Sequence, residues 1–311
     1  MTNIYVETSA VNYLFDNIFN SPKNSSLKTK ELQISKGRKW YISSLTLWEI
    51  FLTKNEPRRF GLFDFSRCLC YDYLMPSPEE IIVNYIKSGC PKIEKRYELK
   101  SNSLFSDEWT HACANLNYAF QPDREQLEER TKSIRLMAEI FQTPLLVPKS
   151  IYNLNDSETK LTNAYLKYIF DKISRLYGDT IDDELVKFIN VTLKVTLVLL
   201  CYGIGFDKPT IESFWNSLGK MEPLERLEYS IQHFPEIFYR GPITNISKMI
   251  LIQMPKIGRG LYFDSLHSSY ITYSDLYLTN DRHFINFKNT HNNDPNMLKI
   301  IDVRSLPLHN V

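Results

Sequence analysis

The chain has 311 residues, of which 43% are hydrophobic and 23% are charged, and its formal net charge is +1. This composition is typical of a folded globular protein and excludes a disordered or low-complexity chain. The near-zero net charge excludes a global field that attracts nucleic acid, so a polyanion must be bound by local basic patches. The length predicts about two domains.

The cysteines and the apolar segments bear on the compartment. The sequence has five cysteines and no Cys-x-x-Cys motif, so neither a disulfide framework nor a zinc ribbon is predicted. Reduced thiols in a cytoplasmic protein are the simpler interpretation. The N-terminus lacks the charged region and the apolar stretch of a signal peptide. The most apolar window, residues 188–206, contains Asn190, Thr192 and Lys194, so we expect a buried helix there and no membrane association.

Strands alternate with helices in the first part of the chain. Short apolar, β-prone runs predict strands at residues 4–6, 40–42 and 71–75. Polar residues directly after these runs predict helices, capped by Thr8 or Ser9, by Ser43 or Ser44, and by Ser77. This alternation predicts parallel strands joined by crossover helices.

The pattern changes in residues 90–255, where long amphipathic helices replace the strands. These helices are predicted to start at Asp123, Ser157 and Thr180, with two more at residues 224–233 and 246–254. We therefore expect residues 90–255 to form an all-helical insertion.

The alternation of strands and helices returns after residue 255. A helix is predicted at residues 263–273, and strands are predicted at 276–279 and 299–303. We expect residues 1–89 and 256–311 to form one domain, which the insertion interrupts. The expected fold is an α/β/α sandwich with a parallel central sheet.

Acidic residues directly follow two of the predicted strands. Glu7 follows the first strand, and Asp281 follows the strand at 276–279. In parallel sheets ligands bind beyond the carboxyl ends of strands, so Glu7 and Asp281 can meet at one edge. Glu49 and Asp264 are expected near the starts of helices that face the same edge. Clustered carboxylates repel one another unless a cation neutralises them, so this pattern predicts a divalent metal site.

Four segments of the sequence resemble the acidic motifs of PIN-domain nucleases. They are Tyr5-Val6-Glu7-Thr8-Ser9, residues 42–49 with Glu49, residues 263–267 with Asp264, and residues 278–284 with Asp281. The resemblance covers the two α/β segments and not the insertion. It implies a parallel sheet between helices, with three or four acids that bind Mg²⁺ or Mn²⁺ at one rim. Many members of the family are ribonucleases, including toxins of bacterial toxin–antitoxin pairs, so an endoribonuclease is expected.

The resemblance and the chemistry of metal ions together imply a role for each residue. Metal ions activate a water for attack on a phosphodiester, and Mg²⁺ prefers oxygen ligands. Glu7 and Asp281 are expected to bind the metal directly, Asp264 directly or through water, and Glu49 through water or by orienting the attacking water. Hydrogen bonds that fix these carboxylates are expected from Thr8, Ser9, Thr279 and Asn280.

Basic residues provide candidate contacts to substrate phosphates. Lys54, Arg58, Arg59 and Arg67 follow Glu49 in the sequence, and Arg282 follows Asp281. We expect Arg58, Arg59 and Arg282 to bind phosphates of RNA, although single-stranded DNA stays open and a solvated surface is the simpler alternative. Asp275 is left out because six residues of extended chain, about 20 Å, separate it from Asp281.

Two other functions stay open. In the first, the protein is a catalytically inactive PIN-like scaffold whose acids only cap helices and whose insertion binds an inhibitory or regulatory protein partner. Glu7 favours this alternative, because the family usually has Asp at the first motif. The second is a small-molecule phosphatase, which needs a closed pocket instead of an open groove.

Overall fold

The computed structural model describes residues 2–19, 38–70, 74–78, 81, 106–114, 125, 128, 241–253 and 259–306. Contacts divide the chain into two compact units. Unit 1 comprises Met1–Ser77, Arg96–Arg130 and Tyr270–Val311, and unit 2 comprises Pro78–Lys95 and Thr131–Ser269. The predicted boundaries after residues 89 and 255 lie outside the described residues and stay predictions. The helices predicted from Asp123, Ser157 and Thr180 and at 224–233 also lie almost entirely outside them.

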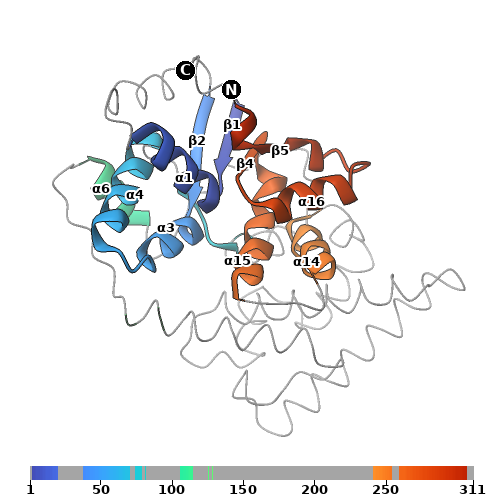
Figure 1. Cartoon of the computed structure of the whole chain (residues 1–311), viewed down its shortest axis with the longest axis horizontal. Helices are drawn as coiled ribbons and strands as arrows, with labels where there is room; N and C mark the ends of the chain where they lie inside the picture. The colour runs from blue at the N-terminus through green and yellow to red at the C-terminus, as the bar shows by residue number, and fades with distance from the viewer. Residues whose placement is uncertain are drawn as a thin grey trace, which may run out of the picture. The chain divides into compact units, whose positions relative to one another are not determined.

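Unit 1 contains a five-stranded parallel sheet in the order β3-β2-β1-β4-β5. Strands β2, β1, β4 and β5 are labelled in Figure 1. The strands are β1 Thr2–Val6, β2 Arg38–Ser43, β3 Leu74–Met75, β4 Leu276–Thr279 and β5 Ile300–Asp302. The α/β class with a parallel sheet is therefore confirmed. The third strand is shorter than predicted in the described residues, because 71–73 lie outside them.

Strand β1 lies at the centre of the sheet. Ile4 is paired with Trp40 of β2 on one side and with Leu276 of β4 on the other. From β1 the chain continues outward through β2 and β3, and the later strands β4 and β5 extend the opposite side. The strand order therefore reverses between β1 and β4, which makes the carboxyl ends of these two strands a topological switch point.

The helices of unit 1 lie between or after its strands in the sequence. They are α1 Thr8–Leu14, the π-helix η1 Phe15–Phe19, α3 Ser44–Phe51, α4 Glu56–Leu69, α6 Ser106–Ala114 and α16 Arg282–Thr290. Short 3₁₀ helices are η3 Ser268–Tyr273, which begins in unit 2, η4 Met297–Lys299 and η5 Val303–Ser305. Helix α6 lies within the segment predicted as the insertion and contacts α4.

The helix caps agree with the sequence in one place and differ in another. Ser43 caps α3, as one of the two predicted residues, by accepting a bond from Thr46 N at 3.1 Å. The prediction that Thr8 or Ser9 caps α1 is wrong. Glu7 is the N-cap, and its side chain reaches forward to accept a bond from Ser9 N at 2.9 Å.

Helix α4 is absent from the predicted elements, although the sequence carries a signal for it. Asn55 accepts a bond from Arg58 N at 2.9 Å and is the N-cap, and Pro57 stands in the first turn. An Asn followed closely by Pro is a helix start signal.

The side chains of β1 alternate between the two faces of the sheet. Ile4 and Val6 belong to the apolar core that α1, α3, α4 and α6 cover. Tyr5 points to the other face, where its ring contacts those of Tyr270 in η3 and Tyr277 in β4. Both faces of the sheet are therefore packed, as expected for parallel strands.

Unit 2 is described at α14 Pro242–Gln253 and α15 Arg259–His267, which contact each other. The helix predicted at 246–254 is confirmed and begins earlier, with Pro242 at its first position. The helix predicted at 263–273 begins at Arg259, so the prediction that Asp264 lies at a helix start is wrong. The preceding residues extend the helix by more than a turn. Within the described residues, no helix is both long and apolar enough to cross a membrane.

Gly61 of α4 is required by the packing of Phe15. A β-carbon at Gly61 would lie 2.7 Å from Cζ of Phe15, which is buried against Phe65 with ring centroids 6.0 Å apart. We predict that Gly61→Ala lowers the free energy of unfolding by about 1 kcal/mol. Overpacking costs about 1–3 kcal/mol, and the gain in helix propensity of about 1 kcal/mol offsets part of it.

Urea denaturation of four proteins tests this prediction: the wild type, Gly61→Ala, Phe15→Leu and the double variant. In the Phe15→Leu background the clash is relieved, so Gly61→Ala should become neutral or stabilising. An equal destabilisation in both backgrounds would show that Phe15 is not the cause.

The thiol of Cys70 makes the stability of unit 1 depend on pH. Burial raises the pKa of Cys70 well above its ordinary value of 9.0, and the nearby thiol of Cys113 raises it further. The folded protein thus resists ionisation that the unfolded chain allows, so stability is full below about pH 9 and is lost as pH rises above it. We predict that the free energy of unfolding falls less steeply with pH in Cys70→Ala than in the wild type. Between about pH 9 and pH 10 the decrease should be smaller in the variant by up to about 1 kcal/mol. Denaturation at a series of pH values measures the two slopes, and identical slopes would contradict the prediction.

Candidate functional site

The carboxyl edge of the sheet brings together residues from both ends of the chain. Glu7 directly follows β1, and Thr279 is the last residue of β4. These two strands are neighbours on either side of the switch point. The predicted meeting of the first and fourth acidic motifs at one edge is the arrangement found in unit 1.

The carboxylate of Glu7 is buried, with 4% of the residue exposed. Its Oε1 accepts a bond from Ser9 N at 2.9 Å. Its Oε2 accepts bonds from the Ser9 hydroxyl and from Thr279 Oγ1, the latter at 3.1 Å. This pattern suits an ionised carboxylate, which accepts hydrogen bonds and donates none.

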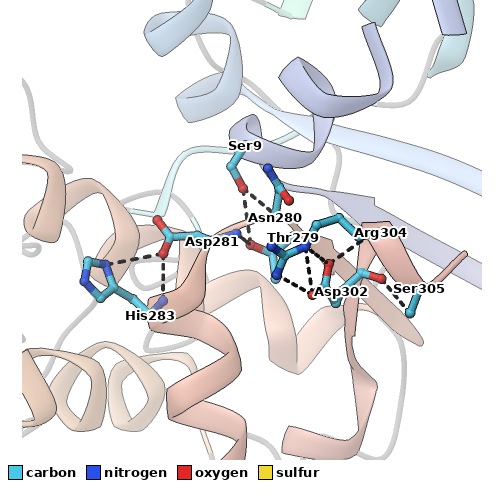
Figure 2. A network of polar contacts seen from close by, with 8 residues as sticks. All are labelled: Ser9, Thr279, Asn280, Asp281, His283, Asp302, Arg304 and Ser305. Carbon is cyan, nitrogen blue, oxygen red and sulfur yellow. Dashed lines mark hydrogen bonds and ion pairs between the residues drawn. The ribbon is translucent and has the colours of Figure 1, made fainter. Parts of the chain in front are cut away.

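The hydroxyls of Ser9 and Thr279 connect the end of β4 to Glu7. Ser9 Oγ accepts a bond from Asn280 N at 2.9 Å, and Thr279 Oγ1 accepts one from Asp281 N at 3.0 Å. Each hydroxyl then donates its single proton to Glu7 Oε2. Figure 2 shows Ser9, Thr279, Asn280 and Asp281 gathered at this point. Ser9 and Thr279 thus make the contacts that were expected to fix a carboxylate.

Glu49 lies in the second turn of α3 and is partly exposed. Thr8 Oγ1 donates a bond to Glu49 Oε2, so α1 holds this second carboxylate as well. One carboxylate oxygen of Glu7 and one of Glu49 lie within 4.8 Å of each other. Two ionised carboxylates at this separation repel, and a cation between them removes the repulsion. A set of carboxylate oxygens suits Mg²⁺ or Mn²⁺.

Asp281 caps helix α16. Its Oδ1 accepts a bond from His283 N at 2.7 Å and lies 3.4 Å from His283 Nδ1. In Figure 2 one carboxylate oxygen of Asp281 is directed toward His283, and the other is turned away from it. One oxygen therefore serves the cap while the other is available to a ligand.

The side chain of Asn280 adds an oxygen at the same strand end. Its Oδ1 is buried and has no hydrogen-bond partner among the described residues. The contact of Asn280 with the carboxylate network runs through its backbone N–H to Ser9, and not through its side chain as expected. A buried amide oxygen of this kind needs a water or a cation, and amide oxygens are ligands of hard cations.

Asp264 belongs to the second compact unit. It is partly buried in α15 and precedes the buried His267 by three residues, so the two share one side of the helix. Unit 2 is described separately from the unit that holds Glu7, Glu49 and Asp281. The prediction that Asp264 joins these residues stays a prediction.

Arg58 has an acidic partner within unit 1. It makes a double hydrogen bond with Asp16, at 2.8 and 3.0 Å, and a third bond with Asn12 Oδ1 at 3.0 Å. These contacts with Asp16 raise the pKa of Arg58. Because Asp16 neutralises it, Arg58 is a weaker phosphate ligand than its position in the sequence suggests.

The other predicted basic residues differ in their surroundings. Arg59 donates to Thr53 O at 3.1 Å, and the buried Arg67 donates to Ala112 O at 3.0 Å. Arg282 is exposed at the start of α16 and directly follows Asp281. The phosphate roles of Arg58, Arg59 and Arg282 stay predictions, and Arg282 is the one adjacent to a carboxylate of the candidate site.

The exclusion of Asp275 is confirmed. It precedes β4, whereas Asp281 follows that strand. Asp275 Oδ2 accepts a bond from Asn3 N at 2.7 Å, and Asp275 N donates to Asn3 O at 2.8 Å. Asp275 therefore closes the opposite edge of the sheet.

One buried residue near the site, Tyr5, was not predicted from the sequence. Tyr5 is fully buried, and its hydroxyl contacts Ser43 Oγ at 2.8 Å and Thr46 Oγ1 at 3.3 Å. Burial raises the pKa of Tyr5 well above 10.0, and the charges of Glu7 and Glu49 act in the same direction, so the hydroxyl stays protonated. The alternation of β1 puts Tyr5 and Glu7 on one face, which is the signal that could have identified it.

The chain has no match among protein-family models, curated proteins or solved structures. Function is therefore inferred from the geometry of the site and from the sequence motifs. The geometry provides two held carboxylates within 4.8 Å, a third on the adjoining strand end, and a buried amide oxygen. These oxygens fit a hard divalent cation, and His283 adds a ring nitrogen close to Asp281.

We predict that Glu49→Gln raises the free energy of unfolding of the metal-free protein by up to about 1 kcal/mol. The change removes one of two neighbouring like charges, while the amide oxygen of Gln still accepts the bond from Thr8. It should also reduce the rise in Tm that Mn²⁺ produces, because binding to the folded state is weakened. Urea denaturation in EDTA and thermal melts with Mn²⁺ measure the two effects.

The matched control is Glu56→Gln, which removes an exposed carboxylate from the first turn of α4. It should leave the Mn²⁺ effect on Tm unchanged. If Glu49→Gln and Glu56→Gln behave alike in both measurements, the Glu7–Glu49 pair does not hold a cation.

Proposed function

We propose that this protein is a metal-dependent nuclease, most simply an endoribonuclease, with a PIN-like α/β/α fold and a helical insertion. One observation carries the proposal: oxygens of Glu7 and Glu49 lie within 4.8 Å of each other at the switch point of a parallel sheet. Open α/β sheets bind their ligands there. The acidic motifs that resemble PIN-domain nucleases supply these same residues.

The residues of unit 1 have distinct roles in the proposed reaction. Glu7 and Asp281 hold Mg²⁺ or Mn²⁺, with Asn280 Oδ1 as an additional oxygen at the same edge. An ion bound there would lower the pKa of a coordinated water and would neutralise charge on the phosphate. Glu49, held by Thr8, would share this ion with Glu7 through a bound water and would orient that water for attack. Asp264 is proposed as a further ligand on the strength of its motif.

RNA is the proposed substrate, and single-stranded DNA is the alternative within the same chemistry. Arg282 is the preferred phosphate contact because it is exposed next to Asp281. Arg58 and Arg59, the two other proposed contacts, are less favoured because each already donates a hydrogen bond within the protein. A cytoplasmic location and a regulatory protein partner, as in toxin–antitoxin pairs, belong to the same proposal.

A catalytically inactive scaffold is the second candidate, and one observation favours it. Glu7 and Asp281 each cap a helix, which is a sufficient structural reason for a carboxylate at both positions. Under this alternative the protein binds no metal specifically and acts by holding a protein partner.

We predict that Asp281→Asn lowers Mn²⁺-dependent cleavage of a fluorescent single-stranded RNA by on the order of 100-fold or more, because a charged ligand is lost. Stability should change little, since Asn and Asp are equivalent N-caps. The measurements are the initial cleavage rate with Mn²⁺ and with EDTA, and the midpoint of urea denaturation.

Asp302→Asn is the matched control. Asp302 also ends a strand of this sheet and caps a short helix, and it pairs with Arg304 at 2.5 Å (Figure 2). Its amide variant should cleave within about twofold of the wild type. Full activity of Asp281→Asn would remove Asp281 from the site, and a wild type that binds no Mn²⁺ in calorimetry would support the inactive scaffold.

A further inference from the structure

Three buried hydroxyls form a triangle beneath the candidate metal site. Tyr5 Oη lies 2.8 Å from Ser43 Oγ and 3.3 Å from Thr46 Oγ1, and the latter two are 3.2 Å apart. All three residues are 0% exposed. Ser43 Oγ also accepts the capping bond from Thr46 N. The triangle therefore joins the central strand to the end of β2 and the first turn of α3.

The triangle connects the two elements that carry the paired carboxylates. Tyr5 lies in β1 and precedes Glu7, which directly follows the strand, by two residues, so both side chains stand on the same face. Thr46 precedes Glu49 by three residues on α3, so the two are neighbours on one side of the helix. A rotation or shift of the start of α3 would therefore change the separation of Glu49 from Glu7.

The ring of Tyr5 is itself held in place. It stacks on Tyr270 with centroids 4.6 Å apart and contacts Tyr277 at 5.2 Å. Tyr270 Oη donates to Pro76 O at 2.8 Å, which fixes the stacking partner to the end of β3. A tyrosine hydroxyl on a ring with these contacts has little freedom, so it can act as a fixed point for α3.

We propose that Tyr5 is a positioning residue of the metal site, whose hydroxyl holds the first turn of α3 so that Glu49 faces Glu7 across one cation. Tyr5 does not touch the metal or the substrate. The inference rests on the proposed function, because it needs the two carboxylates to share an ion.

Calorimetric titration with Mn²⁺ of the wild type, Tyr5→Phe and Ser44→Ala tests the proposal. Tyr5→Phe keeps the stacked ring and removes the hydroxyl. It should raise the Kd for Mn²⁺ by roughly tenfold, because loss of a residue that positions a metal ligand typically weakens metal binding by about 10- to 100-fold. Ser44 is the matched control in the same turn, because its buried Oγ has no hydrogen-bond partner among the described residues. Ser44→Ala should bind Mn²⁺ within about twofold of the wild type.

A second control separates positioning from a general loss of stability. Cys70→Ala removes a buried side chain from the end of α4, in the core on the other face of the sheet. It should lower stability without changing the Kd for Mn²⁺. All titrations are made at a temperature where circular dichroism shows each variant to be folded. If Tyr5→Phe does not fold, Thr46→Val takes its place, since it removes another corner of the triangle and should raise the Kd to a similar extent.

The outcomes distinguish this inference from the proposed function. A wild type that binds no Mn²⁺ overturns the proposed function and this inference with it. A wild type that binds Mn²⁺, with an unchanged Kd in Tyr5→Phe or in its replacement Thr46→Val, overturns this inference alone. An equal rise in the Kd of Ser44→Ala or Cys70→Ala also overturns it, because the effect is then one of loosened packing.

Discussion

The candidate site depends on the buried carboxylate of Glu7. A carboxylate that is only 4% exposed needs hydrogen-bond donors to be tolerated in the interior. Ser9 supplies a backbone donor and a hydroxyl donor from α1, and Thr279 supplies a hydroxyl from β4. These donors come from both sides of the point where the strand order reverses. The bonds that satisfy Glu7 therefore also join the two halves of the sheet edge, and the fold and the site are stabilised by the same atoms.

The two strand-end acids are held in place by the helices that follow them. Glu7 caps α1 and Asp281 caps α16, so each commits one oxygen to a backbone N–H. A capped carboxylate keeps one orientation, which lowers the cost of ordering it around a ligand. Glu49 is held differently, by the hydroxyl of Thr8 and by the position of α3. The position of Glu49 therefore depends on how α3 packs against the sheet, whereas Glu7 and Asp281 are fixed by the helices that they cap.

Local patterns in the sequence predicted the strands and the acids that end them. Ile4 and Val6, and Leu276 and Leu278, mark their strands because buried strands are apolar and short. The strand order was not predictable, because it is decided by pairing between distant segments. The cap by Glu7 was missed because a short polar side chain is the usual cap. The alternation of β1 could have marked Tyr5 as a neighbour of Glu7, but the contacts of Tyr5 with Ser43 and Tyr270 depend on distant segments.

The pairing of β1 with β4 has a consequence for biosynthesis. Glu7 and Thr279 are 272 positions apart, so their bond closes a very long loop and makes the contact order of the sheet high. The ribosome delivers β1, β2 and α3 first, and β4, which completes the edge, follows only after the long segment that separates it from α3. A nascent or truncated polypeptide that lacks β4 therefore contains Glu7 and Glu49 without the hydrogen bond from Thr279 that holds Glu7. For the nuclease proposed above, this order of assembly would delay activity until β4 has been synthesised.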